Sequence, residues 1–254
     1  MYRGDCRELL RRIPAGTIDV VIADPPFYLD VPNEETVIDH YIKKNGMKPR
    51  FRQEWDKFVD ADDYQQFSDS LFEQLQRVVA PTGSVFVFTV HNNLGLIDLA
   101  VRRAGLTVLH HIVWAKRNPA PVLSTRRLQF SHETIVWCAK TPDYVFNYNT
   151  LKASGFEGDR FKAKGKQHRD IIEASTSNAE SVGHPAQKPI GVYRRLLEIA
   201  GRQGGILLDP LAGSGTAAIA AMEFGMRCIM IELDDRYVEI IKRRVSRNDN
   251  GRGR

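Results

Sequence analysis

Cysteine is scarce in this chain, and long apolar runs are absent. Its 254 residues include three cysteines, Cys6, Cys138 and Cys228, which lie far apart and form no Cys-x-x-Cys pair. Such spacing disfavours both a disulfide framework and a cysteine-based zinc site, and it suits a reducing compartment. No apolar run approaches the ~18 residues that a membrane span needs, and the first residues lack the apolar core of a signal peptide. We therefore expect a cytoplasmic protein with no metal ion and no membrane contact.

A large excess of charge of one sign is also lacking. The net charge is +5 at pH 7 and the sequence pI is about 9.1, a mildly basic balance that is compatible with a polyanionic partner. Hydrophobic residues make up 43% and charged residues 26%, as in ordinary globular proteins. The length suffices for one large domain or for a domain with an insertion.

Strand-like apolar runs alternate with amphipathic helical segments along most of the chain. This order predicts an α/β fold with a mostly parallel sheet and helices on both faces. The predicted strands are 18–23, 85–90, 111–115, 134–138, 206–209 and 228–232. The predicted helices cover about 62–79, 93–103 and 189–201, and two more follow Gly215 and begin near Asp234. Pro81 and Gly83 are expected to end the first helix and to precede the second strand.

The run Asp24-Pro25-Pro26-Phe27 directly follows the first predicted strand. Two consecutive prolines end a strand because neither has an N–H to donate and both have a fixed φ. The resulting rigid turn would hold a carboxylate, free backbone carbonyls and an aromatic ring close together. These groups are suited to binding a planar ring that carries an exocyclic amino group. The alternative is an ordinary strand-ending turn.

A second motif combines a strand, a glycine turn and a helix start between Ile206 and Thr216. Glycines let a ligand approach the backbone, and a helix N-terminus presents free N–H groups. Glu232 ends the next strand, 17 residues after Gly215, where an acid can accept hydrogen bonds from ribose hydroxyls. A nicotinamide dinucleotide remains an alternative, but Asp209 would repel a pyrophosphate. A carboxylate there suits a ligand with an ammonium group, such as S-adenosylmethionine.

Taken together, these motifs resemble those of the amino-directed DNA methyltransferases of the permuted β class. In that family the Asp-Pro-Pro-aromatic motif comes first and Asp-Pro-x-x-Gly-Ser-Gly-Thr comes near the C-terminus, as at Asp24 and Asp209 here. The segment 184–189 is similar to the family's His-Pro-x-Gln-Lys-Pro, except that Ala186 stands where many members have Thr. Residues 4–6 and the middle blocks 55–58, 81–84, 114–119 and 132–134 agree as well. The resemblance covers nearly the whole chain.

The resemblance implies a Rossmann-like S-adenosylmethionine-dependent methyltransferase fold, with 1–254 as a single domain in permuted motif order. It implies transfer of a methyl group from S-adenosylmethionine to the exocyclic N6 of a flipped-out adenine in DNA. Asp24, where some members have Ser, favours adenine N6 over cytosine N4. The alternatives are a cytosine-N4 enzyme, a catalytically silent DNA-binding relative and a nicotinamide-dependent oxidoreductase. A homodimer and a companion restriction enzyme are left open as partners.

The candidate site residues follow from the two motifs and from the resemblance. The predicted catalytic residues are Asp24, Pro25, Pro26 and Phe27. The predicted cofactor-binding residues are Asp5, Cys6, Asp24, His184, Gln187, Lys188, Asp209, Leu211, Ala212, Gly213, Ser214, Gly215, Thr216 and Glu232.

Two long polar stretches are the candidates for DNA contacts. Segment 29–53 is expected to be a mobile DNA-contacting loop, and segment 117–183 a target-recognition insertion. Between Lys152 and Arg169 the second holds six Lys or Arg against two acids, with aromatic residues interleaved. The predicted DNA-binding residues are Lys43, Lys44, Arg50, Arg52, Arg126, Arg127, Lys152, Arg160, Lys162, Lys164, Lys166 and Arg169.

Overall fold

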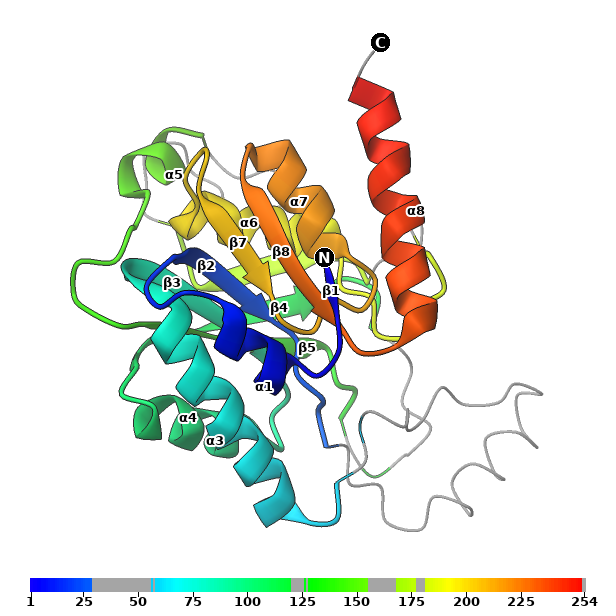
Figure 1. Ribbon diagram of the computed structural model, residues 1–254. Coiled ribbons are helices and arrows are strands. Elements are labelled where there is room, and N and C mark those ends of the chain that lie inside the picture. Colours follow the sequence, from blue (N-terminus) through cyan, green and yellow to red (C-terminus); the bar gives the residue numbers. More distant parts are fainter. Residues whose placement is uncertain are drawn as a thin grey trace.

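The computed structural model describes residues 1–28, 56, 58–119, 126, 128–154, 168–176 and 181–252. Within these residues the strands form one eight-stranded sheet in the order β1-β8-β7-β2-β3-β5-β4-β6. Strand β5 runs antiparallel to its neighbours β3 and β4, and the other neighbouring pairs are parallel. The fold is therefore the mostly parallel α/β sheet that the sequence predicts (Figure 1).

The strands are β1 Tyr2–Arg3, β2 Ile18–Ala23, β3 Val79–Thr89, β4 Thr107–Lys116, β5 His132–Ala139, β6 Ile171–Ala174, β7 Ile206–Asp209 and β8 Arg227–Glu232. The helices are α1 Cys6–Leu9, the 3-10 helix η1 Leu10–Arg12, α3 Ala61–Val78, α4 Leu94–Arg103, α5 Tyr148–Ser154, α6 Ile190–Ala200, α7 Thr216–Phe224 and α8 Asp235–Arg252. None of the described helices is long and apolar enough to cross a bilayer.

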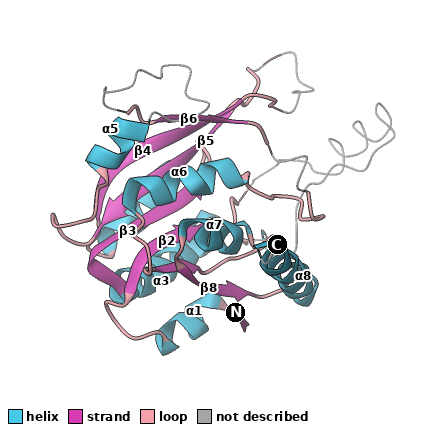
Figure 2. Cartoon of the chain, turned by 90° about the horizontal axis from the view of Figure 1, so that it is seen from above, coloured by secondary structure: helices cyan, strands magenta, loops and turns pink. Residues whose placement is uncertain are grey.

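Helices cover both faces of the sheet, and the central strand β2 is buried on each side (Figure 2). Because successive side chains of a strand point to opposite faces, β2 contributes to two separate cores. Val20 and Ile22 pack in the core that includes α6 and α7. Val21 and Ala23 pack in the core that includes α1, α3 and α4. A strand buried on both faces reads as a continuous apolar run, and this explains why the run 18–23 was visible in the sequence.

The predicted start of the second strand, at residue 85, is wrong. β3 begins at Val79, so Pro81 and Gly83 lie inside the strand rather than in a break before it. The register shifts between the Ile18–Val79 and Val20–Ser84 pairs, and the extra residues on β3 accommodate the proline without a ladder N–H. Gly83 fits there because a Cβ would lie only 2.8 Å from the Ile18 carbonyl oxygen.

Several short elements escaped prediction, among them β1, α1, α5 and β6. β6 lies inside the segment 117–183 and pairs in parallel with β4, so part of the predicted insertion forms an edge strand of the sheet. The division of the chain into a domain, a loop and an insertion stays a prediction. The loop 29–53 lies outside the described residues, as do residues 120–125, 127, 155–167 and 177–180 of segment 117–183.

Three parallel strands, β2, β7 and β8, end at the same edge of the sheet. Ligands of open parallel sheets bind outside the carboxyl ends of the strands. Asp24, Pro210 and Leu233 are the first residues after these strands, so the fold directs the two sequence motifs to one edge.

Candidate active site

A cavity of about 660 Å³ opens at this edge of the sheet. Its lining includes the four predicted catalytic residues, 24–27, together with the turn residues 210–214 and the start of α1. The lining also includes residues 184–186, Lys188, residues 231–234 and Tyr237 of α8. A cavity of this size is typical of small-molecule sites. Asp24 and Gly213, 189 residues apart in the chain, thus face the same space.

The turn after β2 is held by side chains from other elements. The hydroxyl of Tyr64, on α3, donates to the Pro26 carbonyl oxygen at 3.0 Å, and the Asn93 amide donates to the Phe27 carbonyl oxygen. The Tyr28 N–H donates to the Asp56 carboxylate at 2.8 Å. Tyr28 itself has a φ of 42°, in the left-handed region that few non-glycine residues adopt. These contacts fix a strained backbone at the cavity wall.

The Asp24 carboxyl group is ion-paired on one side only. Its Oδ2 accepts a hydrogen bond from the Lys188 ammonium at 2.7 Å, while the buried Oδ1 has no donor among the described residues. Burial raises the pKa of Asp24 to about 6, and the neighbouring Lys188 opposes that rise. Asp24 is therefore mostly ionised at pH 7 and keeps unused acceptor capacity.

Lys188, predicted to bind the cofactor, has its ammonium at the catalytic turn. Its Nζ lies 4.7 Å from the centre of the Phe27 ring and 3.6 Å from Glu133 Oε2, on β5. Burial lowers the pKa of Lys188, but the Asp24 and Glu133 carboxylates outweigh burial and hold that pKa above its ordinary value. Its carbonyl oxygen accepts from the Thr216 hydroxyl at 3.3 Å, so the Lys188 backbone also touches the start of α7.

The glycine turn before α7 depends on two glycines at positive φ. Gly213 has φ +48°, and a Cβ there would lie 2.9 Å from His184 Nε2. Gly215 has φ +74°, and a Cβ there would lie 3.0 Å from Ile241 of α8. Larger residues would therefore suffer both backbone strain and a clash. His184 accepts at Nδ1 from the Ala186 N–H, and burial lowers its pKa to about 4, so it is neutral at pH 7.

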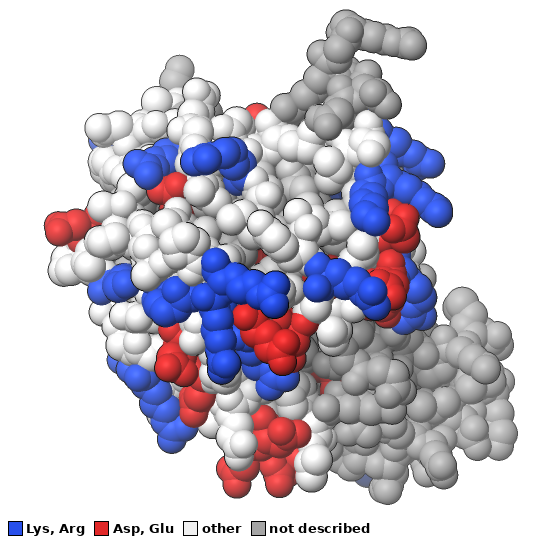
Figure 3. Space-filling view, viewed as in Figure 1, with Lys and Arg blue, Asp and Glu red and all other residues white. Residues whose placement is uncertain are grey.

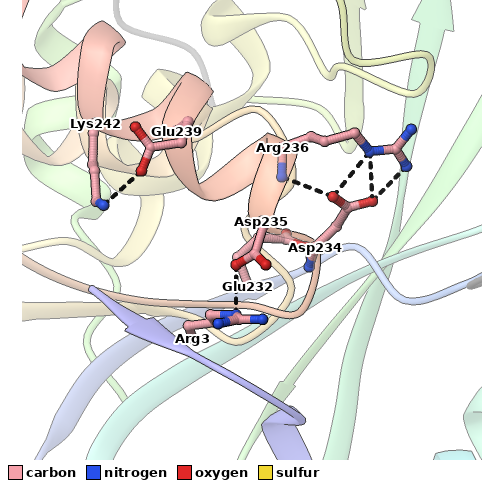
Figure 4. Close-up of polar contacts among 7 residues, drawn as sticks. All are labelled: Arg3, Glu232, Asp234, Asp235, Arg236, Glu239 and Lys242. Carbon is pink, nitrogen blue, oxygen red and sulfur yellow. Dashed lines mark hydrogen bonds and ion pairs between the residues drawn. The ribbon is translucent and has the colours of Figure 1, made fainter.

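Acidic residues border the glycine turn at the end of β8. Glu232 accepts from the Gly213 N–H at 2.7 Å and from the Asp234 N–H at 2.8 Å. Figure 4 shows Glu232 beside the ion pairs that join Arg3 to Asp235 and Arg236 to Asp234. Glu232 therefore supports the turn directly, and both its oxygens already hold backbone donors.

The other predicted cofactor residues divide into two groups. Asp5, Cys6, Leu211, Ala212 and Ser214 line the cavity, and Asp5 also caps α1 and binds the Arg7 guanidinium at 2.6 Å. The residues that do not line it are Gln187, Asp209, Gly215 and Thr216. Gln187 accepts from the Val182 N–H, and Asp209 accepts from the Leu211 N–H at 3.1 Å. The Gln187 and Asp209 side chains therefore bind backbone N–H groups of segments near the cavity.

Sequence reasoning missed Tyr64, Asn93 and Asp56, which hold the catalytic turn, and Glu133, which contacts Lys188. Tyr64 was visible only as one member of the apolar stripe of α3. Asp56 and Glu133 stood within the blocks 55–58 and 132–134, but nothing in the sequence separated them from neighbouring acids. Only the structure shows which element each of these side chains reaches.

Most of the predicted DNA contacts fall outside the described residues. They are Lys43, Lys44, Arg50, Arg52, Arg127, Arg160, Lys162, Lys164 and Lys166. The remaining three, Arg126, Lys152 and Arg169, are exposed. On the face seen in Figure 3, Lys and Arg side chains alternate with Asp and Glu side chains among the described residues and form no continuous basic patch.

The charges around the cavity indicate what it can hold. Among the described residues, its lining includes the six acids Asp5, Asp24, Asp56, Asp63, Glu232 and Asp234 and the two cationic side chains Arg7 and Lys188. This balance suits a ligand with positive charge and disfavours a pyrophosphate. S-adenosylmethionine carries a sulfonium and an ammonium group and no phosphate, so the residues fit it. Among the described residues no group of three or more His, Cys, Asp or Glu could hold a metal ion.

Comparison with solved structures defines the class of the fold. The chain matches the structure "M1.HpyAVI-SAM complex" with a TM-score of 0.67 and 22% identity, over 96% of this chain and 97% of that one. It matches the cytosine-N4-specific PvuII DNA methyltransferase with a TM-score of 0.73 and 17% identity, over 98% of this chain and 90% of that one. The fold is that of the S-adenosylmethionine-dependent methyltransferases.

Comparison of sequences identifies the family. The profile of the DNA methylase family matches residues 18–243. Type II methyltransferase M2.MboI of Moraxella bovis is 30% identical over 96% of this chain and 86% of its own length. Type II methyltransferase M.HinfI of Haemophilus influenzae is 28% identical over 96% of this chain and 67% of its own length. The chain belongs to the amino-directed DNA methylase family, whose methyl donor is S-adenosylmethionine. Its assignment to the permuted class stays a prediction.

Proposed function

We propose that the chain methylates the exocyclic N6 of adenine in DNA. This proposal depends on one observation, the orientation and the free acceptor capacity of the Asp24 carboxylate. Its carboxylate is oriented by Lys188, keeps free acceptor capacity and shares one cavity with the glycine turn. A carboxylate at this position, in place of Ser, favours adenine over cytosine within the family that the sequence resembles.

The chemical difficulty lies in the target amine, because its lone pair is delocalised into the base. Asp24 and the Pro25 carbonyl would accept hydrogen bonds from the two N–H groups, which favours a tetrahedral nitrogen. S-adenosylmethionine, when bound, supplies a methyl group made electrophilic by the sulfonium. The residues contribute alignment and stabilise the positive charge that develops on the nitrogen.

The target base must leave the duplex to reach Asp24, which lies in a cavity wall. Flipping a base costs a few kcal/mol, and stacking on a side chain offsets part of that cost. Phe27 is the proposed stacking partner. It is half-buried beside Lys188, which holds a cation against its ring.

The roles of the other residues extend this proposal. Gly213, Leu211, His184 and Asp5 would form the cofactor side of the cavity, and Glu232 would hold the turn. Segments 29–53 and 117–183 would contact DNA. A homodimer and a companion restriction enzyme also stay proposals, since nothing in the geometry bears on them.

The proposal is tested by incubating the protein with methyl-labelled S-adenosylmethionine and unmethylated DNA, followed by nucleoside analysis. We expect labelled N6-methyladenine. The Asp24→Ala protein, prepared from the same host, controls for a contaminating methylase and should yield no label. Labelled N4-methylcytosine in place of N6-methyladenine would assign the other base, and the PvuII enzyme shows that this fold also serves cytosine-N4 chemistry. DNA binding without label in either base would indicate a silent relative.

A further inference from the structure

Four charged side chains of alternating sign lead from the surface of the sheet to the catalytic turn. Lys116 Nζ, on β4, lies 2.8 Å from Glu133 Oε1, on β5. Glu133 Oε2 lies 3.6 Å from Lys188 Nζ, and Lys188 Nζ lies 2.7 Å from Asp24 Oδ2. Each of the two middle members is at least nine-tenths buried, with Glu133 8% exposed and Lys188 5%.

Glu133 is linked to the catalytic turn through its contact with Lys188. It is not among the residues that line the cavity. It lies on the same face of β5 as Ile135 and Trp137, which belong to the core beneath α6. The Lys188 ammonium is enclosed by the Phe27 and Phe88 rings, at 4.7 and 5.4 Å. Its polar neighbours include Asp24 Oδ2 at 2.7 Å and Glu133 Oε2 at 3.6 Å.

We propose that Glu133, braced by Lys116, is a positioning residue that holds the Lys188 ammonium against Asp24 and thereby orients the carboxylate for methyl transfer. The proposal rests on the proposed function for its catalytic consequence. Its physical reason is that a buried ammonium needs two well-placed partners to repay its desolvation. With Glu133 removed, Lys188 would be drawn toward water and away from Asp24.

The pKa of Asp24 shows whether Glu133 positions Lys188 or acts on Asp24 only as a nearby negative charge. The charged and titratable groups that face Asp24 are Lys188 before α6, Glu133 on β5, Asp56, Tyr64 on α3, Asp209 on β7 and Tyr193 on α6. If Lys188 stays in place when Glu133 is neutralised, the pKa of Asp24 falls, because a like charge has gone. If Lys188 moves away, the pKa rises, because the ion pair that opposes burial is lost.

The experiment follows the Asp24 carboxyl by carbon-13 NMR titration, with its signal assigned from Asp24→Asn. We expect Glu133→Gln to raise the pKa of Asp24 by about one unit, in the same direction as Lys188→Met. Single-turnover methyl transfer near pH 7.5 should slow roughly 10- to 100-fold, and the acidic limb of the pH profile should move to higher pH. Glu198→Gln is the matched control, since Glu198 pairs with buried Arg195 on α6 and should change neither.

A fall in the pKa of Asp24, or no change, in Glu133→Gln would overturn the proposal. Should that variant fail to fold by circular dichroism, Glu133→Asp replaces it, because it keeps the charge but shortens the reach by one methylene. A raised pKa there supports positioning, and an unchanged pKa refutes it. If the wild-type protein transfers no methyl group, the proposed function fails, while the titration still decides whether Glu133 orders Lys188 and Asp24.

Discussion

The two turns that meet at the cavity, 24–28 after β2 and 210–215 after β7, are held in shape in opposite ways. The first has two prolines, accepts hydrogen bonds from Tyr64, Asn93 and Lys188, and donates one from the Tyr28 N–H to Asp56. The second relies on Gly213 and Gly215 at positive φ and on its own backbone N–H groups. The first turn therefore presents hydrogen-bond acceptors, which suit the amino group of the target base. The second turn lets a ligand approach its backbone closely, which suits the cofactor.

The acids at the two strand ends differ as well. Asp24 has a cation at 2.7 Å and a pKa of about 6. Burial raises the pKa of Asp209 to about 8, and no cation within the described part of the chain opposes that rise. At pH 7 the first is mostly ionised and the second mostly protonated. Lys188 therefore accounts for the different charge states of two acids that lie near the ends of neighbouring strands. Asp24 has charge available for the reaction, and Asp209 holds the backbone of Leu211.

The largest effect is expected from Asp24→Asn. The amide keeps the shape of the side chain but removes the negative charge and one acceptor. Since loss of one preorganised contact typically costs on the order of 10²–10³ in rate, single-turnover methyl transfer should fall by at least that factor. The dissociation constant for S-adenosylmethionine, measured by calorimetry, should change by less than about threefold, a free energy well below 1.4 kcal/mol. Turnover within tenfold of wild type would remove Asp24 from the chemistry.

Gly213→Ala should distort the turn 210–215 and leave the turn 24–28 unchanged. The new Cβ would meet His184 Nε2 at 2.9 Å, and the positive φ adds strain of about 1–3 kcal/mol. We expect cofactor affinity to fall on the order of tenfold, or about 1.4 kcal/mol, with DNA affinity unchanged in a mobility-shift assay.

Gly16→Ala is the matched control for that change. Gly16 has φ +67°, but no atom lies within 4 Å of the position that a Cβ would take, so its substitution introduces strain without the clash. It should lower the unfolding temperature and leave cofactor affinity intact. Equal losses of affinity in both variants would show that strain, and not the contact with His184, is responsible.

How far the sequence could predict this site depends on the range of the interaction. The strand 18–23 and the turn after it were predictable because apolar periodicity and proline act locally. The shared cavity of Asp24 and Gly213 is explained by the rule that parallel strands end at one edge, once the structure shows that β2 and β7 are parallel neighbours. The contact between Lys188 and Asp24 joins residues 164 positions apart, and it leaves no periodic signal. The start of β3 was predicted wrongly for a related reason. The irregular register around Pro81 becomes visible only when β3 is paired with β2.

The smallest effect is expected from Asp209→Asn, the same chemical change as Asp24→Asn in the neighbouring turn. Asp209 is 1% exposed, and its Oδ1 accepts from the Leu211 N–H, a role that an amide oxygen can also fill. Because burial already keeps the carboxyl mostly neutral at pH 7, little charge is lost. Cofactor affinity and methyl transfer should each stay within about threefold of wild type, or about 0.65 kcal/mol. A loss beyond tenfold would mean that Asp209 acts on the cofactor through its charge, as the sequence motif alone suggests, and the contrast between the two acids would then fail.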